Sequence, residues 1–321
     1  MTADKMAEKR HPVYLLTGFL GSGKTTLLNA ALRDPALANT AVVVNELGDI
    51  GLDQLVVAQA SDNVVLLDAG CLCCANTGAL HETLADLVGR RARGELPPFE
   101  RVIIETSGAA DPAPLLHILL GHPLVTPDFR LAAVVCTVDA QHFLLSRKEH
   151  PELDKQVAMA DRVVITKADV ADSSLIIPVV QEINSEAQLV KKEEAFIGEA
   201  RPRARLGALG PIRLHGRPGG IRAFAFRPGA VTWAGWAAWS QLAAARFGAR
   251  LLRVKGLLQM QDTGEVVMVH GVQGTFHPPQ RFRDWPDAER ANRIVCIARD
   301  IGQADLAETL NVLKNESETQ A

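Results

Sequence analysis

The sequence predicts an α/β fold, in which a doubly wound and mostly parallel sheet is followed by a smaller α+β domain. Two patterns indicate the sheet. Short β-branched runs recur through the first two thirds of the chain and are almost continuously apolar, as in strands that are buried on both faces of a parallel sheet. Helix-like stretches separate most of these runs, and such alternation is typical of a doubly wound domain.

In the first domain, predicted over residues 1–197, we expect a strand at each apolar run and a helix at each longer amphipathic stretch. The strands are expected at residues 13–16 (VYLL), 41–44 (AVVV), 63–67 (NVVLL), 101–104 (RVII), 131–138 (LAAVVCTV) and 162–166 (RVVIT). The helices are expected at residues 25–34, 79–92 and 175–185.

A linker and a second domain are predicted after residue 197. Residues 198–220 are rich in Gly, Pro and Arg without clear periodicity, which is typical of a linker. Residues 221–321 are expected to form an α+β domain, with strands at 221–226, 251–260, 265–276 and 293–298 and helices at 232–247 and 305–315. Three tryptophans recur at helical spacing, and we expect them to pack on the sheet rather than to bind a ligand (Trp233, Trp236 and Trp239).

Composition argues against several classes of protein. With 47% hydrophobic and 22% charged residues among 321, the chain can bury a sizeable core. A net charge of −3 argues against a nucleic-acid partner, and no run of 18 apolar residues predicts a membrane span. The five cysteines are unevenly spaced and the first residues lack the apolar run of a secretory signal, so we expect a cytoplasmic protein.

A phosphate-binding loop is predicted at residues 18–25, GFLGSGKT, which fit the pattern GxxxxGK(S/T) between a predicted strand and a predicted helix. The glycines allow backbone N–H groups to turn toward phosphate oxygens, at the positive end of the helix dipole. Lys24 would neutralise the β- and γ-phosphates, and the Thr25 hydroxyl would bind Mg²⁺. The alternative is a glycine-rich turn without a ligand, which does not account for the strand and helix on either side.

The base is predicted to be guanine. Thr166, Lys167, Ala168 and Asp169 follow a predicted strand, where the Asp169 carboxylate could accept hydrogen bonds from N1–H and the 2-amino group of guanine. Adenine offers no such pair of donors, and each charge-assisted bond is worth about 1.5–3 kcal/mol. The Lys167 side chain would cover the ring. Alternatively, Asp169 only caps the helix that follows.

An acidic residue ends another predicted strand. Glu105 follows two isoleucines and precedes a Thr-Ser-Gly-Ala turn, where it could hold the Mg²⁺ shell or polarise the attacking water. The alternative is that Glu105 merely caps this turn.

Three cysteines fall within four residues of the stretch DAGCLCCAN: Cys71, Cys73 and Cys74. Their spacing differs from the paired CxxC elements of a structural zinc site and from a thioredoxin-like CxxC. A CxC pair can chelate a soft or borderline cation, and a third thiolate or Glu46 could complete an open site suited to handing the metal on.

The position of this thiol segment favours a link to the nucleotide. Both it and the glycine-containing segment 45–53 follow predicted strands, and ligands gather at the carboxyl ends of the strands of a doubly wound sheet. We therefore expect the thiols and the γ-phosphate at one rim. Buried hydrophobic cysteines or a redox thiol are the alternatives, and the isolated Cys136 and Cys296 fit the buried kind.

These motifs, from LTGFLGSGKTTLLN through NELGDIGLD, GCLCC, IIETSGAADPAP and TKAD to RIVCIAR, resemble the CobW-like metallochaperone GTPases, relatives of the urease and hydrogenase nickel-insertion GTPases. The resemblance extends from about Val13 to the last predicted helix. Two features depart from the family pattern: its usual base motif begins with Asn where this chain has Thr166, and the linker holds only His215 where many zinc-linked relatives have several histidines.

The resemblance implies roles for particular residues. Phosphate and nucleotide binding would fall to Gly18, Gly21, Ser22, Gly23, Lys24, Thr25 and Thr26, with Lys167 and Asp169 on guanine. Lys24 and Glu105 would be catalytic, and Thr25 and Glu105 would hold Mg²⁺. The cysteines Cys71, Cys73 and Cys74, with Glu46, would bind the transition metal.

The predicted function is a GTP-hydrolysing metallochaperone with slow intrinsic turnover. It would bind zinc, or else cobalt or nickel, and deliver the ion to a client protein or a cofactor pathway under GTP control. Two alternatives remain open at this point. A P-loop small-molecule kinase would share Lys24 and Thr25 but would not need Asp169, and a non-enzymatic metal- or redox-sensing protein would bind nucleotide without hydrolysing it.

Overall fold

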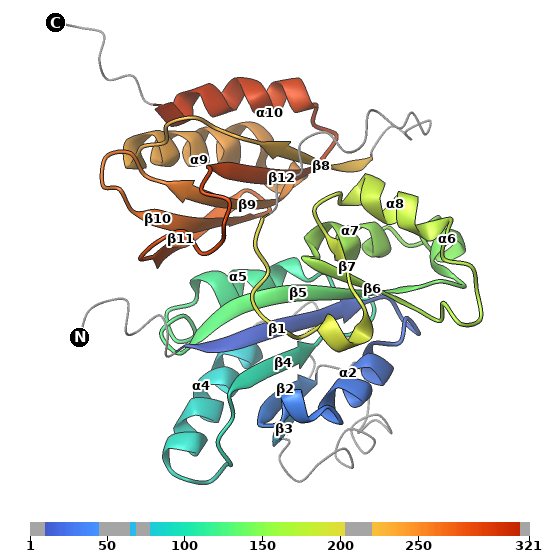
Figure 1. Ribbon diagram of the computed structural model, residues 1–321. Helices are drawn as coiled ribbons and strands as arrows, with labels where there is room; N and C mark the ends of the chain where they lie inside the picture. The colour runs from blue at the N-terminus through green and yellow to red at the C-terminus, as the bar shows by residue number, and fades with distance from the viewer. Residues whose placement is uncertain (1–9, 45–64, 69–77, 203–219, 315–321) are drawn as a thin grey trace, which may run out of the picture. The chain divides into compact units, whose positions relative to one another are not determined.

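The computed structural model of the protein describes residues 10–44, 65–68, 78–202 and 220–314 (Figure 1). The chain divides into two compact units. One consists of Met1–Val180 and Ala187–Ala200, and the other of Gln181–Glu186 and Arg201–Ala321. None of the described helices is both long and apolar enough to cross a lipid bilayer.

The first unit is built on a parallel sheet. Among the described residues, its seven strands are β1 (His11–Gly18), β2 (Thr40–Val44), β3 (Val65–Asp68), β4 (Arg101–Glu105), β5 (Phe129–Asp139), β6 (Arg162–Thr166) and β7 (Gln188–Leu189). Their order is β3-β2-β4-β1-β5-β6-β7, and every pairing is parallel. This confirms the predicted doubly wound sheet, while the two-residue β7 was too short to predict.

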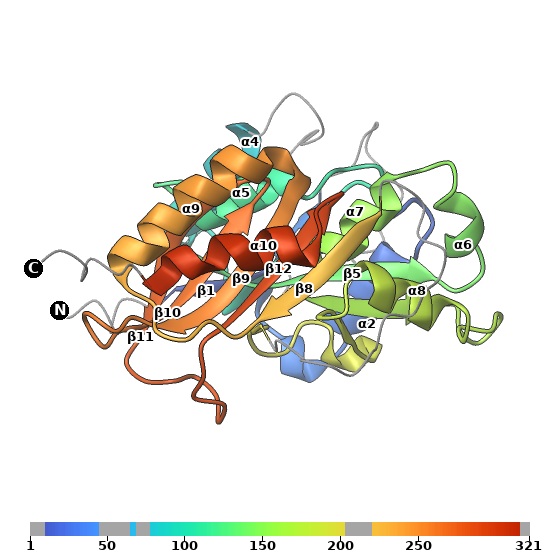
Figure 2. The ribbon, with the colours of Figure 1, turned by 90° about the horizontal axis from the view of Figure 1, so that it is seen from above.

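Helices connect the strands and cover both faces of the sheet. They are α2 (Lys24–Leu32), α4 (Gly78–Ala92), α5 (Ala113–Gly121), α6 (Phe143–Ser146), α7 (Glu152–Met159) and α8 (Ile176–Ile183). Figure 2 shows α2 on one side of β1 and β5 and both α5 and α7 on the other. The sequence predicted α2, α4 and α8 but missed α7, α5, which is apolar on nearly all sides, and α6, which is only 4 residues long.

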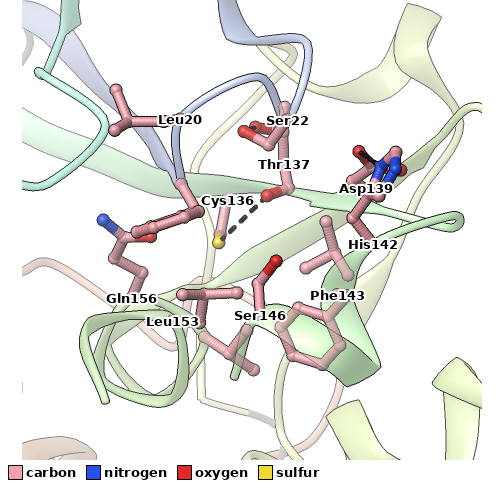
Figure 3. Close-up of a pocket in the computed structure, with 13 residues that line it drawn as sticks. Leu20, Ser22, Cys136, Thr137, Asp139, His142, Phe143, Ser146, Leu153 and Gln156 are labelled. Carbon is pink, nitrogen blue, oxygen red and sulfur yellow. Dashed lines mark hydrogen bonds and ion pairs between the residues drawn. The ribbon is translucent and has the colours of Figure 1, made fainter. Parts of the chain in front are cut away.

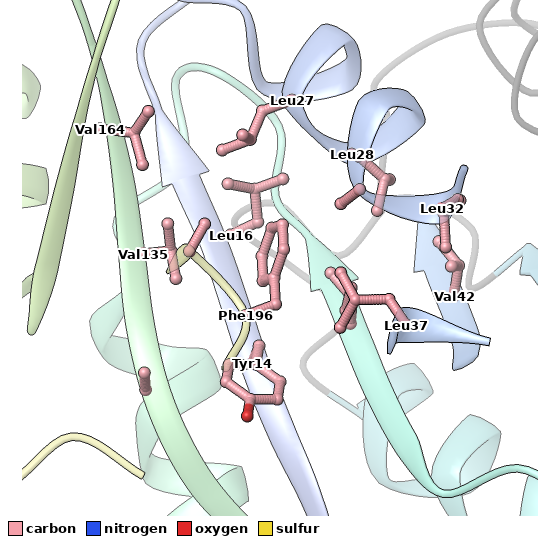
Figure 4. Packing of buried hydrophobic residues seen from close by; sticks show 14 of the residues in the cluster. Tyr14, Leu16, Leu27, Leu28, Leu32, Leu37, Val42, Val135, Val164 and Phe196 are labelled. Atoms are coloured by element: carbon pink, nitrogen blue, oxygen red, sulfur yellow. The ribbon is translucent and has the colours of Figure 1, made fainter. Parts of the chain in front are cut away.

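A hydrophobic cluster fixes α2 against the sheet and so fixes the start of that helix. Leu27 and Leu28 of α2 pack with Leu16 of β1, and all three side chains are at most 5% exposed (Figure 4). Phe196, which follows the 3-10 helix η2 (Lys192–Glu194), covers the same face and meets the Tyr14 ring edge-on at 5.9 Å. Burial of side chains this large is worth about 1.5–3 kcal/mol each.

The first residues of the predicted linker pack on the first unit. The carbonyl oxygen of Gly198 accepts hydrogen bonds from the Tyr14 hydroxyl and an Arg162 guanidinium nitrogen, both at 3.1 Å. The Ala200 amide donates to the Ala132 carbonyl at 2.8 Å, and Ala200 is only 3% exposed.

The second unit is an antiparallel sheet with helices on one face, as predicted for an α+β domain. Its described strands are β8 (Ile221–Phe226), β9 (Leu251–Gln259), β10 (Val266–Val272), β11 (Thr275–Phe282) and β12 (Arg293–Arg299), in the order β11-β10-β9-β12-β8. The helices are α9 (Trp233–Phe247) and α10 (Gln303–Leu310).

One predicted strand of this unit is wrong. Residues 265–276 were expected to form a single strand, but the structure divides them between β10 and β11. Gln273 and Gly274 between these strands both have positive φ, 47° and 77°. Two such residues reverse an antiparallel pair in a two-residue hairpin, so the apolar run continues through a turn.

The tryptophan stripe packs on the sheet, as expected. Trp236 is 6% and Trp239 0% exposed, and both rings meet Phe276 of β11 edge-on at 5.5 Å. The Trp239 indole N–H donates to the Thr309 hydroxyl at 3.1 Å, which ties α9 to α10. Trp233, at the start of α9, is only partly buried.

Candidate functional site

Four motifs meet at the carboxyl edge of the parallel sheet. The glycine-rich loop leaves β1, Glu105 ends β4, Asp139 ends β5 and Thr166 ends β6. The strands are neighbours, and their register places Leu16 beside Glu105, Gly18 beside Thr137, and Asp139 beside Thr166. The edge is therefore a site assembled from segments that lie up to about 150 residues apart in the chain.

The loop over residues 18–25 has the backbone that a phosphate cradle requires. Gly18, Gly21 and Gly23 have φ values of 143°, 71° and 87°, a region that side chains rarely allow. A Cβ on Gly18 would also overlap the Thr137 side chain. Helix α2 begins at Lys24, directly after the loop, so its free N–H groups and positive dipole end point at the loop.

The Lys24 ammonium lies against the inside of this loop. It donates hydrogen bonds to the Gly18 carbonyl at 2.9 Å and to the Phe19 carbonyl at 3.2 Å, and the residue is 8% exposed. A buried ammonium held by neutral carbonyls is a strong partner for phosphate oxygens.

Two threonines at the ends of β5 and β6 form hydrogen bonds with the phosphate loop. The Thr166 hydroxyl donates to the Ser22 carbonyl at 2.7 Å, and the Ser22 and Thr137 hydroxyls share a hydrogen bond of 2.7 Å. Thr166 occupies the position where the family motif usually has Asn, and here its hydroxyl joins the base motif to the phosphate loop. Thr26, the second predicted threonine of α2, is exposed.

Thr25 and Glu105 bring two side-chain oxygen groups together at the start of α2. The Thr25 hydroxyl donates to Glu105 Oε1 at 2.8 Å, and Glu105 is 2% exposed. Mg²⁺ prefers hydroxyl and carboxylate oxygens of this kind, with phosphate and water completing its shell. The two residues therefore fit the ion that the sequence predicted for them.

The segment that follows Glu105 is held against the loop, which sequence reasoning missed. Gly108 approaches Leu20 so closely that a Cβ on Gly108 would lie 2.6 Å from the Leu20 amide nitrogen. The Gln156 side-chain amide also donates to the Gly108 carbonyl at 3.0 Å and to the Ala110 carbonyl at 3.2 Å, and Gln156 is 1% exposed. The glycine three residues after Glu105 was the available signal.

The predicted base motif lies beside the loop. Lys167 has a left-handed backbone, with φ 56°, and its ammonium donates to Asp139 Oδ2 at 2.7 Å. Asp169 is exposed at the same edge, where its carboxylate is accessible to a ligand.

Asp139 is a second residue that sequence reasoning missed. It is 8% exposed, and its carboxylate also accepts hydrogen bonds from the Gln141 amide at 2.7 Å and from His142 Nδ1 at 3.0 Å. Burial opposes ionisation of this carboxyl group, but the hydrogen bonds from Lys167, Gln141 and His142 outweigh it and lower the pKa of Asp139. An acidic residue at the end of a predicted strand was the available signal, as it was for Glu105.

A small cavity lies between the loop, the end of β5, α6 and α7 (Figure 3). Leu20, Cys136 and Gln156 are among the residues that line it. Its volume of about 20 Å³ suffices for a water molecule but not for a purine. This cavity is therefore too small to be a purine site.

The predicted transition-metal ligands, Cys71, Cys73, Cys74 and Glu46, lie outside the described residues. The strands from which their segments leave are neighbours, with Val44 in register with both Asp68 and Glu105. Within the described parts of the chain, no cluster of three or more His, Cys, Asp or Glu side chains is placed to hold a metal ion. Cys136 and Cys296 are buried, as predicted, and burial raises the pKa of each thiol to about 12.

Comparison with known proteins covers both units. Residues 12–196 match the family described as CobW/HypB/UreG, nucleotide-binding domain, and residues 221–314 match the cobalamin synthesis protein CobW C-terminal domain. The zinc chaperone CobW of Pseudomonas aeruginosa is 30% identical over 93% of this chain and 90% of its own length. The zinc chaperone YjiA of Escherichia coli is 36% identical over 159 residues, which are half of each chain.

The fold is also that of a solved structure. The Zn(II)-bound YjiA GTPase from Escherichia coli superposes with a TM-score of 0.68 over 95% of this chain and 99% of that one, at 22% identity.

Proposed function

Because the chain belongs to the CobW/HypB/UreG family and carries a CobW C-terminal domain, we propose that it is a GTP-hydrolysing metallochaperone. It binds a transition metal through Cys71, Cys73 and Cys74 and delivers the ion to a client protein or a cofactor-synthesis enzyme. The observation that carries this proposal is the shared edge of the sheet, where the phosphate loop, the Thr25–Glu105 pair and the base motif meet.

The nucleotide is held by groups that follow or end three strands, β1, β4 and β6. Backbone N–H groups of the loop and the Lys24 ammonium bind the phosphates, and Asp169 and Lys167 bind guanine. Thr25 and Glu105 would hold Mg²⁺, which when bound neutralises charge on the β- and γ-phosphates. The Glu105 carboxylate, buried and hydrogen-bonded to Thr25, is placed to orient the attacking water. Intrinsic turnover is slow, as in other switch GTPases that act with a partner.

Zinc is the favoured cargo. Thiolates bind zinc, cobalt and nickel, and Glu46 can complete the set of ligands. Relatives of this chain are named zinc chaperones in three bacteria and zinc-regulated GTPase metalloprotein activator 1 in two yeasts. The strand that leads into segment 45–53, β2, lies between the strand of Glu105, β4, and the strand that leads into the thiol segment, β3. We therefore expect GTP binding to tighten the metal site and hydrolysis to release the ion.

Titration of the metal in different nucleotide states tests the proposal. Zn²⁺ and Co²⁺ affinities are measured by competition in anaerobic reducing buffer with Mg²⁺GTP, with Mg²⁺GDP and without nucleotide. We expect at least tenfold tighter binding in GTP, about 1.4 kcal/mol of coupling, and by reciprocity tighter GTP binding with metal. Equal affinity in the three states would refute the coupling.

Two substitutions test the ligands. A Cys71→Ser/Cys73→Ser variant is expected to lose the GTP-dependent metal affinity, whereas the buried Cys296→Ala control keeps it. Unchanged affinity in the double variant would refute the thiol assignment.

The guanine assignment has its own test. Asp169→Asn should shift preference from GTP toward XTP, because the amide can donate to the 2-oxo group of xanthine. The control Asp172→Asn alters another exposed carboxylate in the same segment, which hydrogen-bonds only locally to Ser174. If Asp169→Asn kept its GTP preference, the base would be read by another group.

A further inference from the structure

Asp139 is more deeply buried and more heavily bonded than a turn residue requires. Its Oδ1 accepts the Gln141 amide at 2.7 Å, a local turn that Asn would serve equally well. Its Oδ2 accepts two further donors, the Lys167 ammonium at 2.7 Å and His142 Nδ1 at 3.0 Å. The two bonds that Oδ2 accepts are therefore not explained by the turn.

Lys167 is fixed at both ends. Its backbone lies in the left-handed region at φ 56°, immediately after β6, where the Thr166 hydroxyl is bonded to the Ser22 carbonyl of the phosphate loop. Its ammonium is held by Asp139, which ends the neighbouring strand β5 and is itself in register with Thr166. With the Cα and the Nζ both held, the four-carbon stem between them has few remaining conformations.

A free lysine stem is a poor platform for a base. An exposed Lys side chain has much rotamer entropy, and restricting it when a ligand binds weakens the affinity about three- to tenfold. The ion pair with Asp139 restricts the stem before the nucleotide arrives. The Lys167 side chain is still 37% exposed, so its apolar flank remains available to a ring, whereas the Asp139 side chain is only 10% exposed.

We propose that Asp139 is a positioning residue for base recognition, which holds the Lys167 ammonium so that the lysine stem is preset to cover the purine ring. The inference rests on the proposed nucleotide binding at this edge but not on the choice of guanine, because the stem would cover any purine. Asp139 touches neither phosphate nor base and acts only through Lys167. His142 shares the same oxygen from the exposed side, with a side chain that is 56% exposed, and is a secondary partner.

The test compares GTP with inorganic tripolyphosphate, both with Mg²⁺, by isothermal titration calorimetry on the full chain. Tripolyphosphate binds the loop but has no base, so the ratio of the two dissociation constants reports base recognition alone. Asp139→Asn keeps the acceptor for the Gln141 amide and removes the carboxylate from Lys167. We expect Asp139→Asn to weaken GTP binding about three- to tenfold relative to tripolyphosphate binding. This is the gain in affinity expected when a side chain is restricted before the ligand binds.

A double-mutant cycle decides whether Asp139 acts through Lys167. In a Lys167→Ala background, Asp139→Asn should have no further effect on the ratio, because the residue that it positions is gone. The control Asp154→Asn breaks a comparable carboxylate ion pair, with Arg147 at 2.8 Å, which does not involve Lys167. It should leave the ratio within twofold of wild type.

Three results would overturn the inference: an unchanged ratio in Asp139→Asn, an equal loss for GTP and tripolyphosphate, or a loss that persists in the Lys167→Ala background. Thermal unfolding of each variant confirms that it is folded before titration. Wild-type preference for GTP over ATP is measured in the same series. A preference for ATP would refute the proposed GTPase activity. The dissociation constants of Asp139→Asn would then be compared for ATP and tripolyphosphate, so that a failure of the guanine assignment is distinguished from a failure of the role of Asp139.

Discussion

Gly108 offers a direct test of how the segment after Glu105 meets the phosphate loop. Its φ is not in the left-handed region, so the backbone itself tolerates alanine. The obstacle is the loop: a Cβ would lie 2.6 Å from the Leu20 amide nitrogen and 2.8 Å from Leu20 Cα. Both are backbone atoms that cannot rotate away, unlike the Leu20 side chain.

The size of the effect follows from these distances. Relief to an ordinary contact of about 3.4 Å requires a shift of roughly 0.6–0.8 Å in the loop or in residues 106–110, and overpacking of this kind typically costs 1–3 kcal/mol. Gln156 holds Gly108 in place with hydrogen bonds to the Gly108 and Ala110 carbonyls. The loop is therefore the part that moves, and its amides lose their alignment with the phosphates. We expect Gly108→Ala to weaken nucleotide binding about 10- to 100-fold.

The assay is titration of Mg²⁺GDP and Mg²⁺GTP into each variant, together with its thermal unfolding. Gly89→Ala is the matched control, since it makes the same chemical change inside α4, where the nearest atom is the mobile end of Arg93 at 3.2 Å. It should leave affinity unchanged and raise stability by about 0.5–1 kcal/mol, the helix preference of alanine over glycine. Wild-type affinity in Gly108→Ala would refute the close approach and the reasoning built on it.

Three further predictions concern the site and the two cores. Glu105→Gln keeps an oxygen that can accept the Thr25 hydrogen bond but removes the negative charge, so the rate of single-turnover GTP hydrolysis should fall by about 100-fold. Hydrolysis at the wild-type rate would exclude a role for this carboxylate in activating water. Trp239→Ala should lower the free energy of unfolding, measured in urea, by about 3–5 kcal/mol, because this side chain is fully buried. Trp233 is only half-buried, so Trp233→Ala should lower the free energy of unfolding by less than about 1.5 kcal/mol. Equal losses in the two variants would contradict the packing of α9. Cys136 and Cys296 should resist iodoacetamide at pH 8 in the native protein, because the folded chain keeps both thiols protonated up to a pKa of about 12, and peptide mass spectrometry identifies any alkylated site. Their contribution to stability is complete below pH 9 and falls as the pH rises toward 12, since only the unfolded chain ionises there.

The sequence by itself determined the fold class and the phosphate loop, because both are written in short contiguous patterns. A buried parallel strand is an unbroken apolar run, so the strands β1, β2, β4, β5 and β6 could be located from residues alone. The glycines of the loop were predictable because only glycine tolerates the φ values found at positions 18, 21 and 23. The pattern failed where an element was too short, as in α6, or where its polarity was uniform, as in α5 and across the β10–β11 hairpin.

Only the tertiary structure decided which side chains meet at the edge of the sheet. Thr25 and Glu105 are 80 residues apart, Lys167 and Asp139 are 28 apart, and Gly108 and Gln156 are 48 apart, yet each pair is in contact. No local pattern encodes such pairs, because strand order and register bring them together, and these depend on how all the apolar faces are buried at once. Sequence therefore indicated the chemistry at the ends of β1, β4 and β6, whereas the packed sheet added Asp139 at the end of β5 and determined which partner each group contacts.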